Sequence, residues 1–166
     1  MILAIDPGTK KSGYVLWDGL TVVDKGHGAN AEILQDIERN ARGPEARTWT
    51  VAVEHLVSQG THSHERKSTL QTIEWAAFFF QAGGGYDRAM WVTRAEELTY
   101  FRILPGMPGN RDMLLRRAIV RRQGLEYKIT ADGRMIVPGW QDHTLAALAV
   151  ACVAEERIRI RERMVG

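Results

Sequence analysis

The stretch Met1-Ile2-Leu3-Ala4-Ile5-Asp6-Pro7-Gly8 decides the fold. Its first five residues are apolar, and such a continuous run predicts a short buried strand. Asp6 ends the run, and Pro7-Gly8 is a strong turn signal. A carboxylate at the mouth of a buried strand loses hydration, so it needs a partner. A metal ion is one such partner, and the alternative from this stretch alone is that Asp6 only caps the turn.

The size and composition of the chain favour one soluble domain. Its 166 residues suit a single domain over 1–166, with 45% hydrophobic and 25% charged residues. No run approaches the ~18 apolar residues of a membrane span, so we expect no membrane association and a cytoplasmic protein. The single Cys152 excludes a disulfide framework and a zinc site built from cysteines.

The segment from Arg88 to Arg134 is basic, although the net charge of the chain is only +2. Arginine suits phosphate recognition because its planar guanidinium donates to two oxygens at once. A local basic surface on a nearly neutral protein favours nucleic acid as the partner. The residues in this segment that we expect to contact DNA are Arg111, Arg116, Arg117, Lys128 and Arg134.

The order of the predicted elements is three strands, a helix, a strand, a helix, a strand and further helices. Asp18-Gly19 predicts a hairpin, and Asn30 is the expected cap of the first helix. The predicted strands cover residues 1–5, 12–18, 20–25, 49–57 and 90–93, and the predicted helices cover 30–42, 69–82, 96–104, 112–123 and 142–164. The fold class is therefore α/β: a mixed five-stranded sheet, with three antiparallel strands plus parallel crossovers, flanked by helices.

Three further segments have predicted roles. Residues 60–67 form a polar loop, in which His62, His64, Arg66 and Lys67 are expected to be exposed and able to touch DNA. Residues 127–137 form a small hairpin around Asp132-Gly133. The helix from Thr69 to Ala82 is apolar almost all round, which favours a homodimer interface over a helix covered on both sides by its own domain.

Two more acids follow the pattern of Asp6. Glu54 lies near the end of the buried strand over 49–57, and Asp142 begins the last helix near the edge of its core-facing stripe, with His143 beside it. Acids brought to one rim repel each other unless a cation joins them, and oxygen ligands suit Mg²⁺ or Mn²⁺. Two such ions ~4 Å apart can hydrolyse a phosphodiester. We therefore expect Asp6, Glu54, Asp142 and His143 to be catalytic residues and metal ligands.

Each of these residues also has an alternative role. Asp142 is a possible N-cap, and Glu54 a possible partner of Arg47 or Arg66 in a buried ion pair. His55 follows Glu54 and should point to the opposite face of the sheet, where it packs rather than ligates.

The motifs resemble those of the RuvC-type Holliday junction resolvases. Residues 2–9 with Ser12-Gly13-Tyr14 are similar to the opening of that family, and Val51-Ala52-Val53-Glu54 resembles its second acidic strand. Residues 142–151 resemble its last helix. The short form and the unusual middle of the chain suggest a bacteriophage-type member.

The resemblance implies a ribonuclease H-like fold, a homodimer and two divalent metal ions in each active site. It implies paired symmetric nicks across a four-way DNA junction, with Asp6, Glu54 and Asp142 as ligands. The helix from Thr69 would form the dimer interface, and the loop from His62 to Lys67 would probe the junction centre.

One motif departs from the family. Its members usually end with acid-x-x-Asp-Ala-Leu-Ala, or with His in place of the first acid. Aligning Ala147-Leu148-Ala149 puts His143 at the first position and Ala146 where the second Asp should stand. Aligning Asp142 with the first acid instead puts Leu145 at the second. Either way one expected carboxylate is missing, and the ligand role of this helix falls to Asp142, to His143 or to both together.

Other functions are compatible with parts of the pattern. Actin-like ATPases share the opening motif, but they need two lobes and a second phosphate motif. A non-catalytic junction-binding module, and a nuclease for RNA–DNA hybrids or replication forks, remain as alternatives on the same fold.

Overall fold

A computed structural model describes residues 1–42, 49–55 and 63–166 of the chain. The five-stranded sheet has the order β3-β2-β1-β4-β5, in which β1 pairs antiparallel with β2 and parallel with β4. The strands of this sheet are β1 (Ile2–Asp6), β2 (Lys11–Trp17), β3 (Val22–Ala29), β4 (Thr50–His55) and β5 (Met90–Thr93). The helices are α1 (Asn30–Arg42), α2 (Ser63–Ala82), α3 (Arg94–Tyr100), α4 (Arg111–Arg122) and α5 (Asp142–Val165), with a short 3-10 turn, η1 (Gly85–Asp87). This is the predicted mixed α/β fold.

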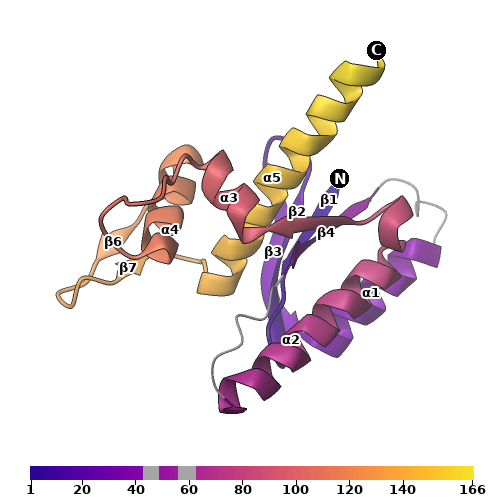
Figure 1. Ribbon diagram of the computed structural model, residues 1–166, viewed down its shortest axis with the longest axis horizontal. Helices are drawn as coiled ribbons and strands as arrows, with labels where there is room; N and C mark the ends of the chain where they lie inside the picture. Colours follow the sequence, from indigo (N-terminus) through magenta and orange to yellow (C-terminus); the bar gives the residue numbers. More distant parts are fainter. Residues whose placement is uncertain (43–48, 56–62) are drawn as a thin grey trace.

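The central strand β1 is buried on both faces, as its continuous apolar run requires. Ile2 and Ala4 pack on the face that α5 covers, whereas Leu3 and Ile5 pack on the face that α1 and α2 cover. Figure 1 shows the two helical layers, with α1 and α2 on one side of the sheet and α5, α3 and α4 on the other. Because side chains alternate along a strand, Asp6 follows Ile2 and Ala4 onto the α5 face.

A buried hydrogen-bond network fixes the turn after Asp6. The Ser12 hydroxyl donates to the side-chain oxygen of Asn30 (2.7 Å) and accepts from the Gly8 amide (3.1 Å). The Asn30 amide group donates to the Gly8 carbonyl (2.9 Å). Asn30 lies in the first turn of α1, and the bonds of its side chain close the β1–β2 turn rather than the helix end predicted from the sequence.

Strand β3 and helix α2 have other boundaries than predicted. Strand β3 spans Val22–Ala29 rather than 20–25, because it pairs with β2 along the whole length of that strand. Helix α2 begins at Ser63, so the predicted loop over 60–67 is wrong from Ser63 onward, and His64, Arg66 and Lys67 are helical. Residues 43–48 and 56–62, which include Arg47 and His62, lie outside the described residues. The small hairpin is confirmed as β6 (Lys128–Ile129) paired with β7 (Met135–Ile136).

In the described parts of the chain, no helix is both long enough and apolar enough to span a membrane.

The contact between β2 and α5 requires a residue without a side chain. A Cβ atom at Gly13 would lie 2.3 Å from the carbonyl carbon and oxygen of His143 and 2.7 Å from the Thr144 nitrogen. Real Cβ atoms do not approach backbone this closely. Gly13 therefore lets the first turn of α5 lie directly on the sheet, and the Thr144 hydroxyl completes the contact by donating to the Gly26 carbonyl (3.2 Å).

We expect Gly13→Ala to destabilise the protein by about 1–3 kcal/mol, because overpacking forces α5 away from the sheet. Thermal unfolding should show a lower midpoint, by about 2–4 °C per kcal/mol. Gly28→Ala is the matched control, since a Cβ at that β3 position makes an ordinary 3.5 Å contact with Ile33. Equal midpoints for the Gly13 variant and the wild type would contradict this account of the close approach.

Candidate active site

Asp6 and Glu54 lie side by side at one edge of the sheet. Strands β1 and β4 run parallel with Ile5 opposite Val53, so the next residue of each strand is an acid at the same carboxyl end. Both acids face α5, since Ala4 and Ala52 of the same parity pack in the cluster on that face. Each acid is only 7% exposed. His55, with the opposite parity, contacts Trp91 on the other face with ring centroids 5.1 Å apart, as its position predicts.

The two acids open into a pocket of about 380 Å³ between the sheet edge, α4 and the start of α5. The pocket contains all four residues that the sequence proposed for catalysis. Its lining consists of Asp6, Glu54, Arg94, Asp112, Leu115, Arg116, Ile119, Asp142, His143 and Ala146.

Glu54 is held in its neutral form by its surroundings. Burial, followed by a hydrogen bond with Asp6 and repulsion from Glu97 and Asp6, raises its pKa from 4.5 to about 10. Arg94 opposes this rise in pKa but does not cancel it. A neutral Glu54 reduces the repulsion between the two neighbouring carboxyl groups, as expected when two acids share a site.

His143 and Asp142, adjacent in sequence, have different positions in the pocket. The His143 Nδ1 lies 2.5 Å from Asp6 Oδ2, and this hydrogen bond raises the pKa of His143. Asp142 forms an ion pair with Arg116 (2.8 Å), and its side chain is 65% exposed. His143 is therefore in direct contact with the buried Asp6, whereas Asp142 lies at the pocket rim.

Arg94 and Glu97 both act electrostatically on Glu54, and neither residue was predicted from the sequence. Both follow β5, the third strand that ends at this edge, because the Thr93–Glu96 capping box starts α3 there. Arg94 donates to Glu97 Oε2 (2.6 Å) and to Asp112. Glu97 is fully buried, and burial raises its pKa to about 7 despite the attraction of Arg94. Within the described residues, its Oε1 has no hydrogen-bond partner. Charged residues just after a third parallel strand are the signal that would have identified them.

The donor chemistry of the pocket fits a divalent cation. Two buried carboxylates and an imidazole line the pocket together, and their oxygen and nitrogen atoms are donors that such an ion accepts. Glu97 does not line the pocket, although its charge acts on Glu54. In the described part of the chain no three such side chains converge on one point as ligands, and Asp6 instead bonds His143 and Glu54. A bound cation would take the place of the proton on Glu54 and of these internal hydrogen bonds.

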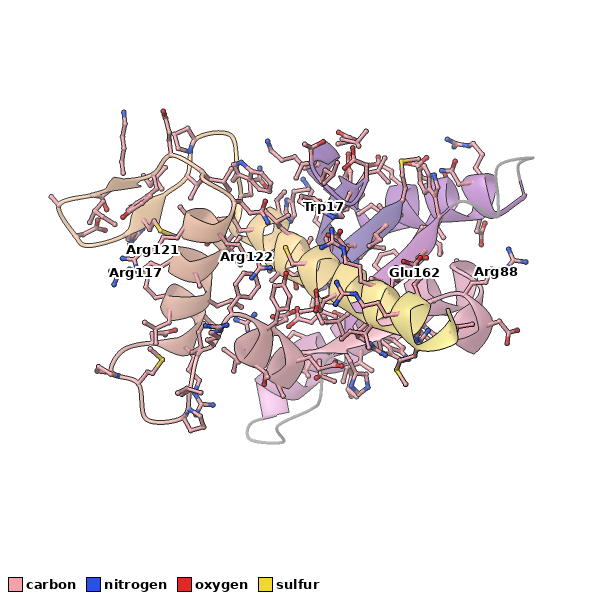
Figure 2. The ribbon with its side chains drawn as sticks, turned by 90° about the horizontal axis from the view of Figure 1, so that it is seen from above. Trp17, Arg88, Arg117, Arg121, Arg122 and Glu162 are labelled. Atoms are coloured by element: carbon pink, nitrogen blue, oxygen red, sulfur yellow. The ribbon has the colours of Figure 1, made fainter. Side chains whose placement is uncertain are left out.

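The residues predicted to contact DNA lie on three elements. Arg111 and Arg117 are exposed on α4, Lys128 and Arg134 are exposed on the hairpin, and Lys67 is exposed on α2. Figure 2 shows Arg117 and Arg121 on the outer side of α4, while Arg122 points inward, where its guanidinium lies 4.4 Å from the centre of the Tyr100 ring. Arg116, on the same helix, lines the pocket and forms an ion pair with Asp142, and its contact with DNA stays a prediction.

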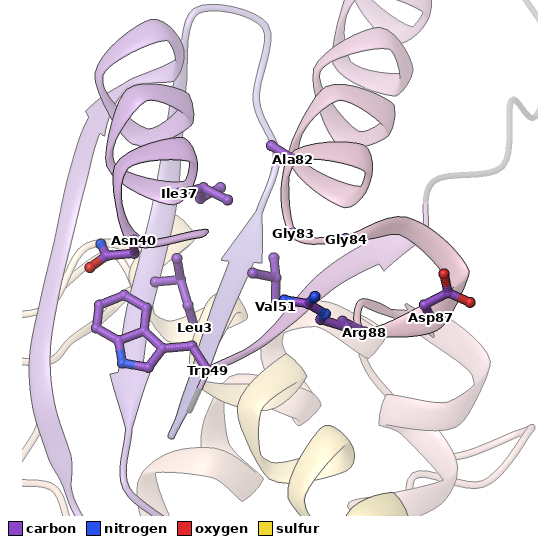
Figure 3. Close-up of a pocket in the computed structure, with 10 residues that line it drawn as sticks. All are labelled: Leu3, Ile37, Asn40, Trp49, Val51, Ala82, Gly83, Gly84, Asp87 and Arg88. Atoms are coloured by element: carbon purple, nitrogen blue, oxygen red, sulfur yellow. The ribbon is translucent and has the colours of Figure 1, made fainter. Parts of the chain in front are cut away.

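A second cavity has a different character. It measures about 210 Å³ and lies on the α1–α2 face, between Leu3 and Val51 of the sheet and Trp49 (Figure 3). Among the described residues, Asp87 supplies the single carboxylate of its lining. The clustered acids at the ends of β1 and β4 are therefore the better candidate for chemistry.

Comparisons with known proteins give a structural relationship without a sequence relationship. No protein-family model matches the chain, and no curated protein matches it. The structure of Thermus thermophilus RuvC in complex with a Holliday junction substrate matches with a TM-score of 0.63 and 12% identity, covering 96% of this chain and 94% of that one. A second Thermus thermophilus RuvC structure matches with a TM-score of 0.54 and 16% identity, covering 96% and 95%.

The chain therefore has the ribonuclease H-like fold of RuvC. At these identities the likeness extends to the fold alone, and the bacteriophage-type origin suggested by the sequence stays a prediction.

We expect Glu54→Gln to stabilise the metal-free protein at alkaline pH. The pKa of Glu54 rises from 4.5 in the unfolded chain to about 10 in the folded one, so the folded state loses stability as the pH rises through this range. Thermal unfolding in EDTA should give the variant the higher midpoint at pH 8, with the difference shrinking toward pH 5.

The matched control is Glu126→Gln, which changes an exposed acid and should not alter the midpoint in the same way. A Glu54→Gln protein less stable than wild type at pH 8 would show that the carboxylate is ionised and compensated.

Proposed function

We propose that this protein is a metal-dependent endodeoxyribonuclease that resolves four-way (Holliday) DNA junctions by paired symmetric nicks, in DNA recombination and repair. One observation supports this most: Asp6, Glu54 and His143 line one pocket at the sheet edge of a RuvC-like fold. A pure binding module gains nothing from buried acids that face DNA phosphates, because like charges repel.

Asp6 and Glu54 would hold Mg²⁺, two ions in each active site, with Mn²⁺ as a possible substitute. The ions would supply an activated water and stabilise the leaving oxygen of the phosphodiester. His143, hydrogen-bonded to Asp6 through Nδ1, keeps that carboxylate oriented and presents its other nitrogen for a metal or a proton. Asp142 forms an ion pair with Arg116 at the pocket rim. It is the alternative to His143 as a further metal ligand.

Branched DNA would lie across the outer side of α4 and the hairpin. Arg111, Arg117, Lys128 and Arg134 are exposed there, on the elements next to the pocket wall. Phosphate contacts of this kind position the substrate without reading its sequence. The predicted contacts of α2, including His64, Arg66 and Lys67, and those of His62 remain part of this proposal.

Two copies of the chain would pair through α2, so that two pockets nick symmetrically. The buried side of α2 packs on the sheet through Ala76, Phe79 and Phe80. Leu70 and Phe78 remain 57% and 49% exposed on the same helix. Exposed large apolar side chains on one helix favour a partner surface.

The decisive experiment incubates the protein with a labelled four-way junction, a fork, an RNA–DNA hybrid and a plain duplex, with and without Mg²⁺. Paired nicks in the four-way junction, without cleavage of the other three substrates, support the proposal. Preferential cleavage of the fork or of the hybrid favours a nuclease for replication forks or for RNA–DNA hybrids. Binding in Ca²⁺ without nicking in Mg²⁺ identifies a non-catalytic module. Sedimentation equilibrium of the same sample reports whether the chain is a dimer.

We expect Asp6→Asn to reduce junction nicking at least about 100-fold, because metal binding needs the charge and even supporting residues of metal sites contribute 10–100-fold. Junction affinity, measured by gel shift in Ca²⁺, should change little, since most of it comes from phosphate contacts by Arg and Lys. Asp36→Asn, on the far face in α1, is the control. Full nicking by the Asp6 variant would remove this residue from the active site.

We expect Arg117→Ala to weaken binding to junctions of every sequence to the same degree. If Arg117 neutralises one phosphate, the plot of the logarithm of junction affinity against the logarithm of salt concentration should become less steep, by about 0.9 in slope. Arg39→Ala removes an exposed cation from α1 and should leave the slope unchanged. A slope identical to that of the wild type would place the DNA elsewhere.

A further inference from the structure

His27 and Asp6 lie in one row across the sheet, with Gly13 between them. Asp6 of β1 pairs with Gly13 of β2, and Gly13 pairs with His27 of β3. Directly opposed residues of antiparallel strands point to the same face, so both side chains rise on the face that α5 covers. Neighbouring strands lie about 4.8 Å apart, and the row therefore holds an acid and an imidazole about 10 Å apart with no side chain between them.

The first turn of α5 fills this gap. The backbone of His143 lies on Gly13 at a distance that leaves no room for a Cβ atom. The hydroxyl of the next residue, Thr144, donates to the carbonyl of Gly26, the neighbour of His27. The helix is thus docked at the one row of the sheet where Asp6 and His27 flank it.

The ring of His143 contacts both residues of the row. Its Nδ1 lies 2.5 Å from Asp6 Oδ2, and its face is parallel to the ring of His27, with centroids 5.4 Å apart and planes 7° apart. The side chain is otherwise half exposed, and the second torsion of a histidine is soft. Without a neighbour on its face, the ring would be free to turn away from Asp6.

We propose that His27 is a positioning residue, whose ring face holds His143 in the orientation that places Nδ1 on Asp6 and leaves Nε2 for the pocket. Among the described residues that line the pocket, His27 is absent, so it acts through His143 rather than on the substrate. The orientation of His143 follows from the contacts alone, whereas the effect on nicking rests on the function proposed above.

The test compares His27→Leu, which fills the volume without a ring face, with His27→Phe, which keeps the ring face but has no nitrogen. His55→Ala is the control, because it removes a histidine at the end of a strand on the opposite face of the sheet. The first readout is the side-chain ¹⁵N and Nδ1–H resonances of His143, recorded in EDTA, where no catalysis is needed. The second is junction nicking in Mg²⁺, and gel-shift affinity in Ca²⁺ is measured in parallel.

We expect His27→Leu to shift or broaden the His143 signals and to reduce nicking roughly tenfold, in line with the strength of ring stacking, with unchanged junction affinity. His27→Phe should restore the signals and the nicking rate to within about threefold of wild type. Thermal unfolding shows whether each variant folds. If His27→Leu does not fold, the His143 signals of His27→Phe alone test the proposal: signals that match those of the wild type support it, and altered signals contradict it.

Two results would overturn the inference. Unchanged His143 resonances in His27→Leu would mean that the stacking does not orient the ring. A His27→Phe protein as defective as His27→Leu would assign the role to the nitrogens of His27 and not to its face. Absence of nicking by the wild type would overturn the proposed nuclease, while the resonances of His143 would still decide the positioning role.

Discussion

Two carboxylates buried side by side, Asp6 and Glu54, are the constraint on which the rest of the site depends. Their charges would repel, and burial removes the water that would screen them, so the pKa of Glu54 is raised well above its usual value. Two neighbouring side chains offset part of this repulsion. His143 forms a hydrogen bond with Asp6, and the charge of Arg94 acts to lower the pKa of Glu54. Such an arrangement costs stability and is typical of functional sites, where the group that relieves the repulsion is a ligand.

The alternation of side chains along β1 and β4 explains why two acids of a hydrophobic sheet lie side by side. Strands β1 and β4 are parallel and in register, with apolar residues on both faces up to Ile5 and Val53. The next residue of each strand falls on the α5 face at the edge, where the strands end and helical cover begins. The Ser12–Asn30 network then holds the turn after Asp6 closed, so this carboxylate is placed by buried hydrogen bonds and not by a free loop.

Much of this arrangement could be predicted, because it depends on patterns local to each segment. The strand-turn signature of residues 1–8, the acid at the end of β4 and the hairpin around Asp132-Gly133 each follow from a short run of residues. The element order follows as well, and a RuvC-like fold is present although no more than 16% of residues are identical to the two RuvC structures. A buried two-faced strand requires apolar side chains of a suitable volume, which many sequences supply.

The sequence by itself determined the sheet, the helical layers and the identity of the acids that meet, since hydrophobic period and turn chemistry are properties of neighbouring residues. Only the tertiary structure showed that His143 contacts Asp6 whereas Asp142 pairs with Arg116. One residue is a rotation of about 100° on a helix, and the approach of α5 to Gly13 sends the imidazole inward to Asp6 and the carboxylate outward to Arg116. The positions of Arg94, Glu97 and His27 beside the other site residues also follow only from the tertiary structure. They arise from the register across strands and from the packing of helices that are distant in the sequence.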